Sequence, residues 1–157
     1  MPLRFVGVIG LALAGAVAFA APVPKPKPGK VDPGKPWEFP DVESKGWEER
    51  KSGLKVWDVK EGDGDEVTAG GSVVVNYVSW LTDGKKFDSS IDRNEPSKFR
   101  LDGLIKGWQE GMVGMKPGGV RRLMIPPELA YGKRGAGNLV PGDATLVFVI
   151  EYIGPGK

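Results

Sequence analysis

Five segments between residues 53 and 154 either alternate apolar with polar side chains or stay apolar over the length of a strand. β-Branched and aromatic residues dominate them, which favours extended structure over helix. The last segment is the most apolar, so we expect it near the centre of a sheet. In chain order the segments are GLKVWDVKEG, SVVVNYVSWLTDGKKFDSS, SKFRL, GGVRRLMIP and ATLVFVIEYI.

A different period appears in one place only. The apolar positions between the third and fourth segments fall on one face of a helix, and they are Leu104, Trp108, Met112 and Met115. Glycines at positions 107, 111 and 114 weaken the intrinsic helix propensity, so packing must hold this helix. The predicted fold class is α+β: a five-stranded antiparallel β-sheet wrapped around one short α-helix.

Two connections stand out. Asp83-Gly84 lies inside the second segment and predicts a tight hairpin of type I′, in which both central residues have positive φ. Residues 126–143 form a long connection rich in Gly and Pro that still carries Tyr131, Leu139 and Val140. Connections of this length are usually functional or disordered, and the apolar content favours the wall of a binding site.

The N-terminus differs in character from the rest. Arg4 precedes an uncharged run from Phe5 to Ala21, which passes through Ala18-Phe19-Ala20, an A-x-A cleavage pattern. We interpret residues 1–20 as a secretory signal peptide. The alternative is an uncleaved membrane anchor, since the run is at the lower length limit for a spanning helix. A secreted or periplasmic location follows, with no stable membrane insertion after cleavage.

Residues 21–36 alternate Pro with Lys, a pattern typical of an extended polyproline II linker. Residues 37–52 are polar with two tryptophans; we interpret them as an irregular lead-in, and the sequence leaves open whether it packs on the domain at 53–154.

Residues 1–36 hold five of the 22 basic and one of the 20 acidic residues, so residues 37–157 carry 17 basic and 19 acidic residues, a net charge of −2. No basic footprint for nucleic acid is present.

Composition excludes several kinds of chemistry. The chain has no histidine and no cysteine, which excludes Ser-His-Asp and Cys-His catalysis, disulfides and the usual zinc ligands. No phosphate-binding or dinucleotide-binding glycine motif occurs. We therefore expect no cofactor and no metal. Asp88, in KKFDSSIDRN, remains open to three interpretations: a catalytic acid or base, a metal ligand, or a turn carboxylate.

Three blocks in this order resemble the FK506-binding-protein (FKBP) family of peptidyl-prolyl cis-trans isomerases, or rotamases. They are VNYVSWLTDGKKFDSSIDRN, LIKGWQEGMVGMKPGGVRRLMIPPELAYG and LVPGDATLVFVIEYI. The resemblance covers residues 53–154. It implies an isomerase that binds the proline of an Xaa-Pro bond in an apolar pocket between helix and sheet. The implied partners are proline-containing polypeptides, with tacrolimus and rapamycin as candidate macrolide ligands, and a monomer is the default.

The resemblance also implies roles for individual residues. Trp108 forms the pocket floor, and Asp88 is an orienting hydrogen-bond acceptor near Tyr77 and Arg93. The Ile105 backbone N–H and the Tyr131 hydroxyl bind substrate carbonyls. The implied catalytic set is Asp88, Tyr131, Phe148 and Trp108, and the implied substrate-binding set is Tyr77, Phe87, Leu104, Ile105, Val140 and Arg93.

The chain departs from the family pattern at three places. Many members have an aromatic residue at the position of Ser97 and a His-Pro pair at that of Ala136-Gly137, and the segment at Asp102-Gly103 is shorter here. These departures imply a less bulky flap and bear on substrate preference and macrolide affinity.

Two other functions remain: a non-catalytic binding or chaperone module using the same pocket, and a hydrolase using Asp88 with Asp92. The hydrolase is disfavoured because it needs two carboxylates in a polar cleft.

Overall fold

A computed structural model of the chain describes residues 36–157. The signal peptide predicted at 1–20, and the linker predicted at 21–36 except for its last residue, lie outside the described residues. The elements are β1 (Glu48–Glu49), β2 (Lys55–Lys60), β3 (Ser72–Leu81), β4 (Lys86–Ser89), β5 (Ser97–Arg100), the 3₁₀ turn η1 (Leu101–Gly103), α1 (Lys106–Gly111), β6 (Val120–Ile125), the 3₁₀ turn η2 (Pro127–Leu129) and β7 (Leu146–Pro155).

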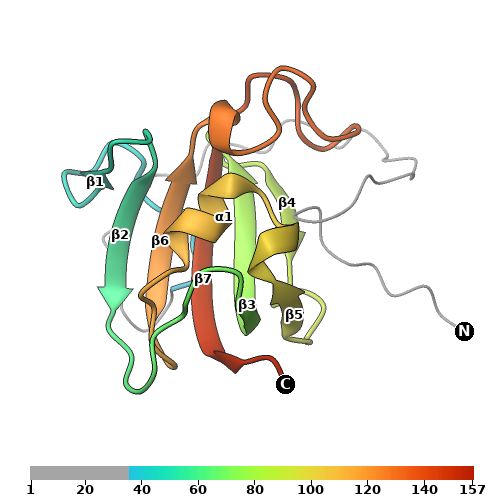
Figure 1. Cartoon of the computed structure of the whole chain (residues 1–157). Helices are drawn as coiled ribbons and strands as arrows, with labels where there is room; N and C mark the ends of the chain where they lie inside the picture. The colour runs from blue at the N-terminus through green and yellow to red at the C-terminus, as the bar shows by residue number, and fades with distance from the viewer. Residues whose placement is uncertain (1–35) are drawn as a thin grey trace, which may run out of the picture.

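All strands join one antiparallel sheet in the order β1-β2-β6-β7-β3-β4, with β5 also paired to β3. Figure 1 shows this sheet curving behind α1. The predicted fold class is confirmed, with the most apolar strand, β7, in the interior of the sheet. The described residues form seven strands and not five. The second predicted segment supplies both β3 and β4, and β1 has only two residues, too few to produce an alternation signal.

The main core lies between α1 and the sheet. The helix is shorter than its apolar face suggested: it covers Lys106–Gly111, and the chain turns at Gly114, which has a φ of +87°. Leu104 and Met115 lie beyond its ends and are nevertheless buried. The helical period therefore identified the buried positions correctly but overestimated the helix.

Glycine allows α1 to approach the sheet closely. A Cβ at Gly107 would lie 2.3 Å from Cγ2 of Ile125, and one at Gly111 would lie 2.6 Å from Cδ1 of Leu123. Both distances are too short for packed carbon atoms. The glycines that lower helix propensity are therefore the residues that let the helix lie on β6.

Arg121 on β6 holds the C-terminal end of α1. Its guanidinium donates hydrogen bonds to the carbonyl oxygens of Gly111 (2.8 Å) and Val113 (3.2 Å), which the helix itself leaves unpaired. Asp58 on β2 accepts two further hydrogen bonds from it, at 2.6 and 3.1 Å. This one side chain thus links β2, β6 and the helix.

The turn at Asp83-Gly84 differs from the predicted type I′. Of the two residues that were expected at its centre, only Gly84 has positive φ, at +87°. The Gly84 N–H donates to the Leu81 carbonyl (3.0 Å), and the Lys85 N–H donates to the Asp83 carboxylate (2.8 Å). The register of the β3–β4 pair also shifts at Ser79/Trp80. A hairpin with a bulge and a single left-handed glycine meets these constraints.

Residues 37–47 pack on the face of the sheet opposite α1, where Figure 1 shows the blue segment running behind the strands. Phe39 contacts Trp80 on β3 edge-to-face, with ring centroids 5.9 Å apart. Trp47 contacts Trp57 on β2 at 5.7 Å. Trp57 in turn covers the buried guanidinium of Arg122, whose Cζ lies 4.8 Å from the ring centroid. Within residues 36–157, no helix is long and apolar enough to span a membrane.

Candidate active site

Trp108 lies at the centre of an aromatic cluster between α1 and the sheet. Its side chain is fully buried (0% exposed). Three rings meet it nearly at right angles: Tyr77 at 5.6 Å, Phe99 at 6.0 Å and Phe148 at 5.5 Å between centroids. Edge-to-face contacts of this kind stabilise beyond the area they bury, so the indole is held in one orientation.

Strand register brings these rings together. Tyr77 pairs with Ile150, and Ser79 pairs with Phe148. Because residues two apart on a strand share a face, Tyr77 and Phe148 both point to the α1 side of the sheet. Phe87 on β4 then contacts Phe148, with centroids 6.3 Å apart. The four predicted aromatic residues of the pocket floor and walls are thus contiguous.

Asp88 lies beside this cluster, buried and fully engaged. Its side chain is 6% exposed. The Tyr77 hydroxyl donates to one carboxylate oxygen (2.6 Å), and the Ser89 N–H donates to the other (2.9 Å). Arg93 donates to that second oxygen at 2.6 Å. A carboxylate that accepts hydrogen bonds from three donors is well suited to orient its neighbours.

Arg93 connects three parts of the site. Besides Asp88, its guanidinium donates to the Tyr77 hydroxyl (3.0 Å) and to the Ser97 hydroxyl (3.3 Å), and it lies over the Tyr77 ring. Burial acts to lower the pKa of Arg93, but the hydrogen bonds to Tyr77 and Asp88 outweigh it and raise the pKa. The cation therefore persists at every physiological pH.

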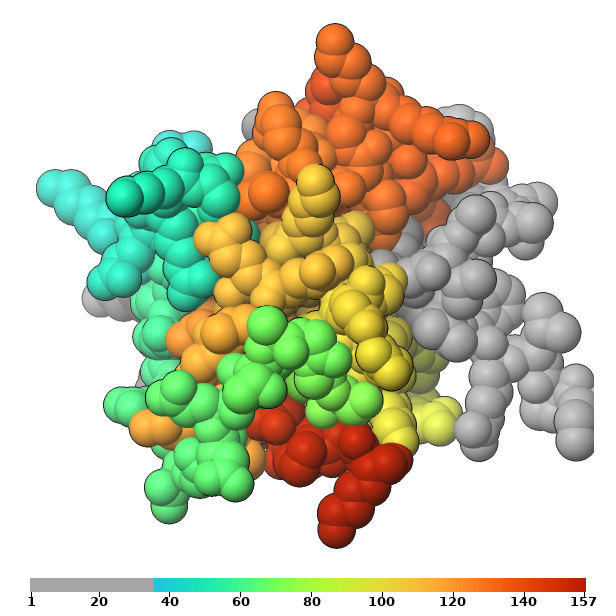
Figure 2. Space-filling model, in the orientation of Figure 1, coloured from blue at the N-terminus to red at the C-terminus, as the bar shows by residue number. Residues whose placement is uncertain are grey.

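The connection 126–143 covers the other side of the site, and Figure 2 shows it, in orange, standing above α1. A bridge between Ala136 and Val140 closes its tip, and Val140 is buried against the main core. Tyr131 is half-buried and packs on the same core, as do Leu104 and Ile105 at the start of α1. Ile105 is the N-cap residue of α1. The backbone N–H groups of the first helical turn have no carbonyl partner within the helix itself.

Sequence reasoning missed two members of this arrangement. Phe99 touches both Trp108 and Tyr77, and alternation within 97–101 already places it on the face shared with buried Leu101. The sequence marks Ser97 only as a departure from the family pattern. It accepts a hydrogen bond from Arg93, which no local sequence signal could have indicated.

Every tyrosine of the chain should titrate above its ordinary pKa of 10.0. Burial, followed by the negative charge of Asp88, raises the pKa of both Tyr77 and Tyr131. Burial also raises the pKa of Tyr152, together with the charge of Asp65. We expect a folded sample at pH 10 to show little tyrosinate absorbance, whereas a urea-unfolded sample shows about half of the full signal.

The sign of the linked stability change follows from these shifts. Below pH 10 the tyrosines are protonated in both states, and their contribution to stability is complete. Above it the unfolded chain loses protons that the fold retains, so the free energy of unfolding falls as pH rises. A tyrosine that titrates in the folded protein with a midpoint at 10 would contradict this assignment.

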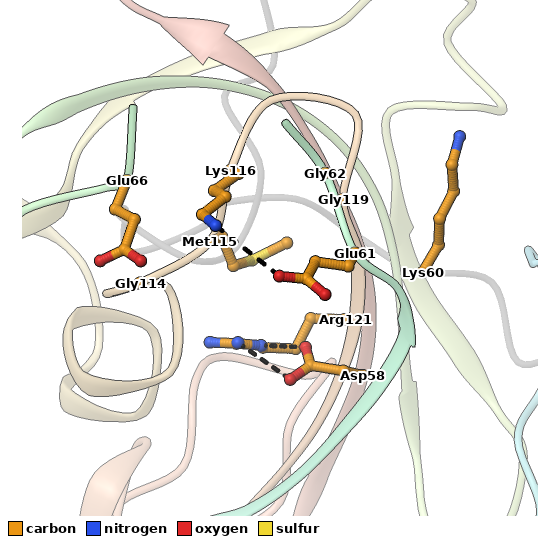
Figure 3. A pocket seen from close by; sticks show the side chains of 10 residues that line it. All are labelled: Asp58, Lys60, Glu61, Gly62, Glu66, Gly114, Met115, Lys116, Gly119 and Arg121. Carbon is orange, nitrogen blue, oxygen red and sulfur yellow. Dashed lines mark hydrogen bonds and ion pairs between the residues drawn. The ribbon is translucent and has the colours of Figure 1, made fainter. Parts of the chain in front are cut away.

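A cavity of about 250 Å³ lies beyond the C-terminal end of α1, beside Gly114 and Met115 (Figure 3). Asp58 pairs there with Arg121, and Glu61 lies 3.7 Å from Lys116. Two acidic side chains that line this cavity are thus each paired with a basic side chain. Among residues 36–157, no group of three or more Asp, Glu, His or Cys side chains could hold a metal ion.

Comparison with known proteins matches this sequence and this fold to one family. The family model for the FKBP-type peptidyl-prolyl cis-trans isomerase matches residues 64–153. An FK506-binding protein of Neisseria meningitidis serogroup B is 48% identical over 103 residues, 64% of this chain and 94% of the relative. A probable FK506-binding protein of Corynebacterium glutamicum is 52% identical over 101 residues, 64% of this chain and 85% of the relative.

Solved structures agree. The crystal structure of FkpA from Escherichia coli superposes with a TM-score of 0.68 at 45% identity, covering 73% of this chain and 53% of FkpA. The crystal structure of AtFKBP13 gives a TM-score of 0.65 at 43% identity, covering 70% of this chain and 98% of that protein. The chain therefore spans about half the length of FkpA. It belongs to the FKBP family and is a peptidyl-prolyl cis-trans isomerase.

Proposed function

We propose that this isomerase acts on Xaa-Pro bonds of exported polypeptides and assists their folding, with the proline bound against Trp108. The observation that carries the proposal is the position of Trp108 at the centre of a ring cluster, directly beside the Asp88–Tyr77–Arg93 network. The connection that carries Tyr131 and Val140 packs on the same core as Trp108. An apolar floor and a few oriented polar groups are what a proline site requires.

The chemistry needs no nucleophile, because isomerisation breaks no covalent bond. The barrier of about 18–20 kcal/mol is the loss of amide resonance, and uncatalysed exchange takes roughly tens to hundreds of seconds. The planar amide is strongly dipolar, and the twisted transition state is less so. Transfer from water to an aromatic pocket therefore raises the ground state more than the transition state. Lowering the barrier by about 4 kcal/mol gives roughly a thousandfold acceleration.

Hydrogen bonds that fit only the twisted amide add to this effect. In our proposal the Tyr131 hydroxyl and the Ile105 backbone N–H bind substrate carbonyls. Asp88 keeps Tyr77 and Arg93 in place and transfers no proton. Its two carboxylate oxygens already accept hydrogen bonds. Asp92 is 54% exposed and pairs with Lys86 at 2.5 Å, which gives the acid-pair hydrolase no support.

Export is the part of the proposal that rests on sequence alone. The pattern of residues 1–20 supports secretion to a periplasm or to the medium, with an uncleaved membrane anchor as the alternative. We also propose that the isolated protein is monomeric. Relatives named FK506-binding proteins make tacrolimus and rapamycin the ligands to test, against the less bulky flap at Ala136-Gly137.

The decisive experiment measures cis-trans exchange of a short Xaa-Pro peptide by NMR, with purified protein, with and without tacrolimus. We expect catalysis that tacrolimus suppresses. Catalysis without suppression would keep the isomerase and reject macrolide binding. A folded sample that binds the peptide but does not accelerate exchange would instead favour a binding module that uses the same pocket.

A further inference from the structure

Residues 37–47, which we call the strap, cover the outer face of the sheet, opposite the candidate active site. The aromatic end of the strap is Trp37 and Phe39. Both pack against a small second core formed by Val78, Trp80, Val120 and Val149. Phe39 meets the Trp80 ring at 70° with centroids 5.9 Å apart. Pro40, the next residue, is buried as well.

The loop that follows β4, residues 90–96, carries Arg93 and packs on this second core as well. Ile91 packs against the same second core, and it lies between Asp88 and Arg93 in sequence. It is the only large aliphatic side chain from Asp88 to Ser97. Val78 pairs with Ser89 across β3 and β4, and Ser79 pairs with Asp88. Alternation therefore directs Asp88 to the α1 side while Val78 and Trp80 face the strap.

Hydrogen bonds anchor the start of this loop: the Ser90 N–H donates to the Tyr77 carbonyl (3.0 Å), and the Asp92 N–H donates to the Ser89 hydroxyl (3.0 Å). Between Ser89 and Glu95 its own backbone bonds are Asn94 N–H to the Ile91 carbonyl (3.0 Å) and Glu95 N–H to the Ser90 carbonyl (3.2 Å). Asn94 adopts a positive φ of +53°. The Arg93 side chain remains 30% exposed. Yet its hydrogen bonds to Asp88 and Tyr77 tolerate errors of only a few tenths of an ångström.

We propose that the aromatic end of the strap is a positioning element for the active site. Trp37 and Phe39 hold Trp80 and Ile91 from the outer face, and Ile91 in turn sets the loop from which Arg93 reaches Asp88 and Tyr77. The strap lies before residue 64, where the family model begins. This inference extends the proposed function, and it rests on the Arg93 network contributing to catalysis.

The test uses the full chain with the double substitution Trp37→Ala and Phe39→Ala. We expect kcat/KM to fall about fivefold, because Arg93 no longer holds its geometry. The matched control is Trp47→Ala, which removes an aromatic contact of the same kind from the same strap. Trp47 contacts Trp57 on β2 and is not among the groups packed on the second core, so kcat/KM should not change.

A double-mutant cycle separates positioning from general loss of stability. In an Arg93→Met background the strap substitution should change kcat/KM by less than about 1.5-fold, since the group it positions is absent. Ile91→Ala should show the same dependence on Arg93. Phe39→Leu, a milder change, should give a smaller loss if the double variant folds poorly.

An equal loss in both backgrounds, or a loss with Trp47→Ala as large as with Trp37→Ala and Phe39→Ala, would overturn the positioning role. So would unchanged kcat/KM in the folded double variant. These outcomes differ from failure of the proposed function, because the unsubstituted protein would still catalyse exchange. If the unsubstituted protein does not catalyse exchange, the proposed function fails first.

Discussion

Replacing Gly107 with alanine should lower the free energy of unfolding by about 2 kcal/mol, although alanine is the better helix former. The new Cβ would lie 2.3, 2.6 and 2.8 Å from three carbons of the Ile125 side chain. Ile125 is fully buried and β-branched, so it has few alternative rotamers. The helix must move away from β6, and Trp108 moves with it. The gain of up to about 1 kcal/mol in helix propensity does not offset this strain.

Urea unfolding of the two proteins measures the effect, and Gly103→Ala is the matched control. A Cβ added at Gly103 would meet no heavy atom within 4 Å, and the residue has no positive φ, so alanine there should change stability by less than about 0.5 kcal/mol. Isomerase activity of Gly107→Ala should also fall, because the pocket floor is displaced. Equal stability of the two variants would mean that the helix is free to shift away from β6 at no cost.

Replacing Asp88 with valine should lower kcat/KM about tenfold, equivalent to about 1.4 kcal/mol of transition-state stabilisation. The Tyr77 hydroxyl would lose its acceptor, while Arg93 would lose one acceptor and retain the hydroxyls of Tyr77 and Ser97. Because Tyr77 is fully buried, an unpaired hydroxyl there is costly. We expect an additional loss of about 2 kcal/mol in the free energy of unfolding, near the low end for a broken buried pair since Arg93 still reaches solvent.

Asp92→Asn is the control for this substitution, because it removes a carboxylate from the same loop without touching the network. Its exposed pair with Lys86 should contribute less than about 1 kcal/mol, and kcat/KM should not change. Exchange NMR and urea unfolding on the same samples measure both quantities. Full activity in a folded Asp88→Val protein would show that the network is structural only and would remove Asp88 from the catalytic set.

Local pattern predicted most of the strands, since alternation records which side chains face the core. The sheet was anticipated from β2, β3, β5, β6 and β7. The two-residue strand β1 was not, because it is held by backbone pairing with Val56 and Lys55 and carries no hydrophobic pattern. The helix was overestimated because Met115 is buried by the chain turning at Gly114, not by helical continuation.

Candidate site residues came from resemblance and not from local pattern, and their contacts required the fold. Tyr77 and Asp88 are 11 positions apart, and Arg121 and Asp58 are 63 apart. The contact of Arg93 with Ser97 depends on how the loop after β4 enters β5. The packing of the strap next to Ile91 depends on which face of β3 each side chain takes.

By itself the sequence determined the class of fold, the positions of the long strands, the absence of histidine and cysteine chemistry, and the family to compare. The fold class and the excluded chemistry depend on composition and on short-range periodicity, and the family depends on the resemblance of three sequence blocks. Only the tertiary structure decided where α1 ends, how closely glycine lets it approach β6, and that Phe99 and Ser97 join the site. It also decided that the strap and the Arg93 loop share one core. These depend on distances between segments remote in the chain, which packing and strand register set and no local window of residues contains.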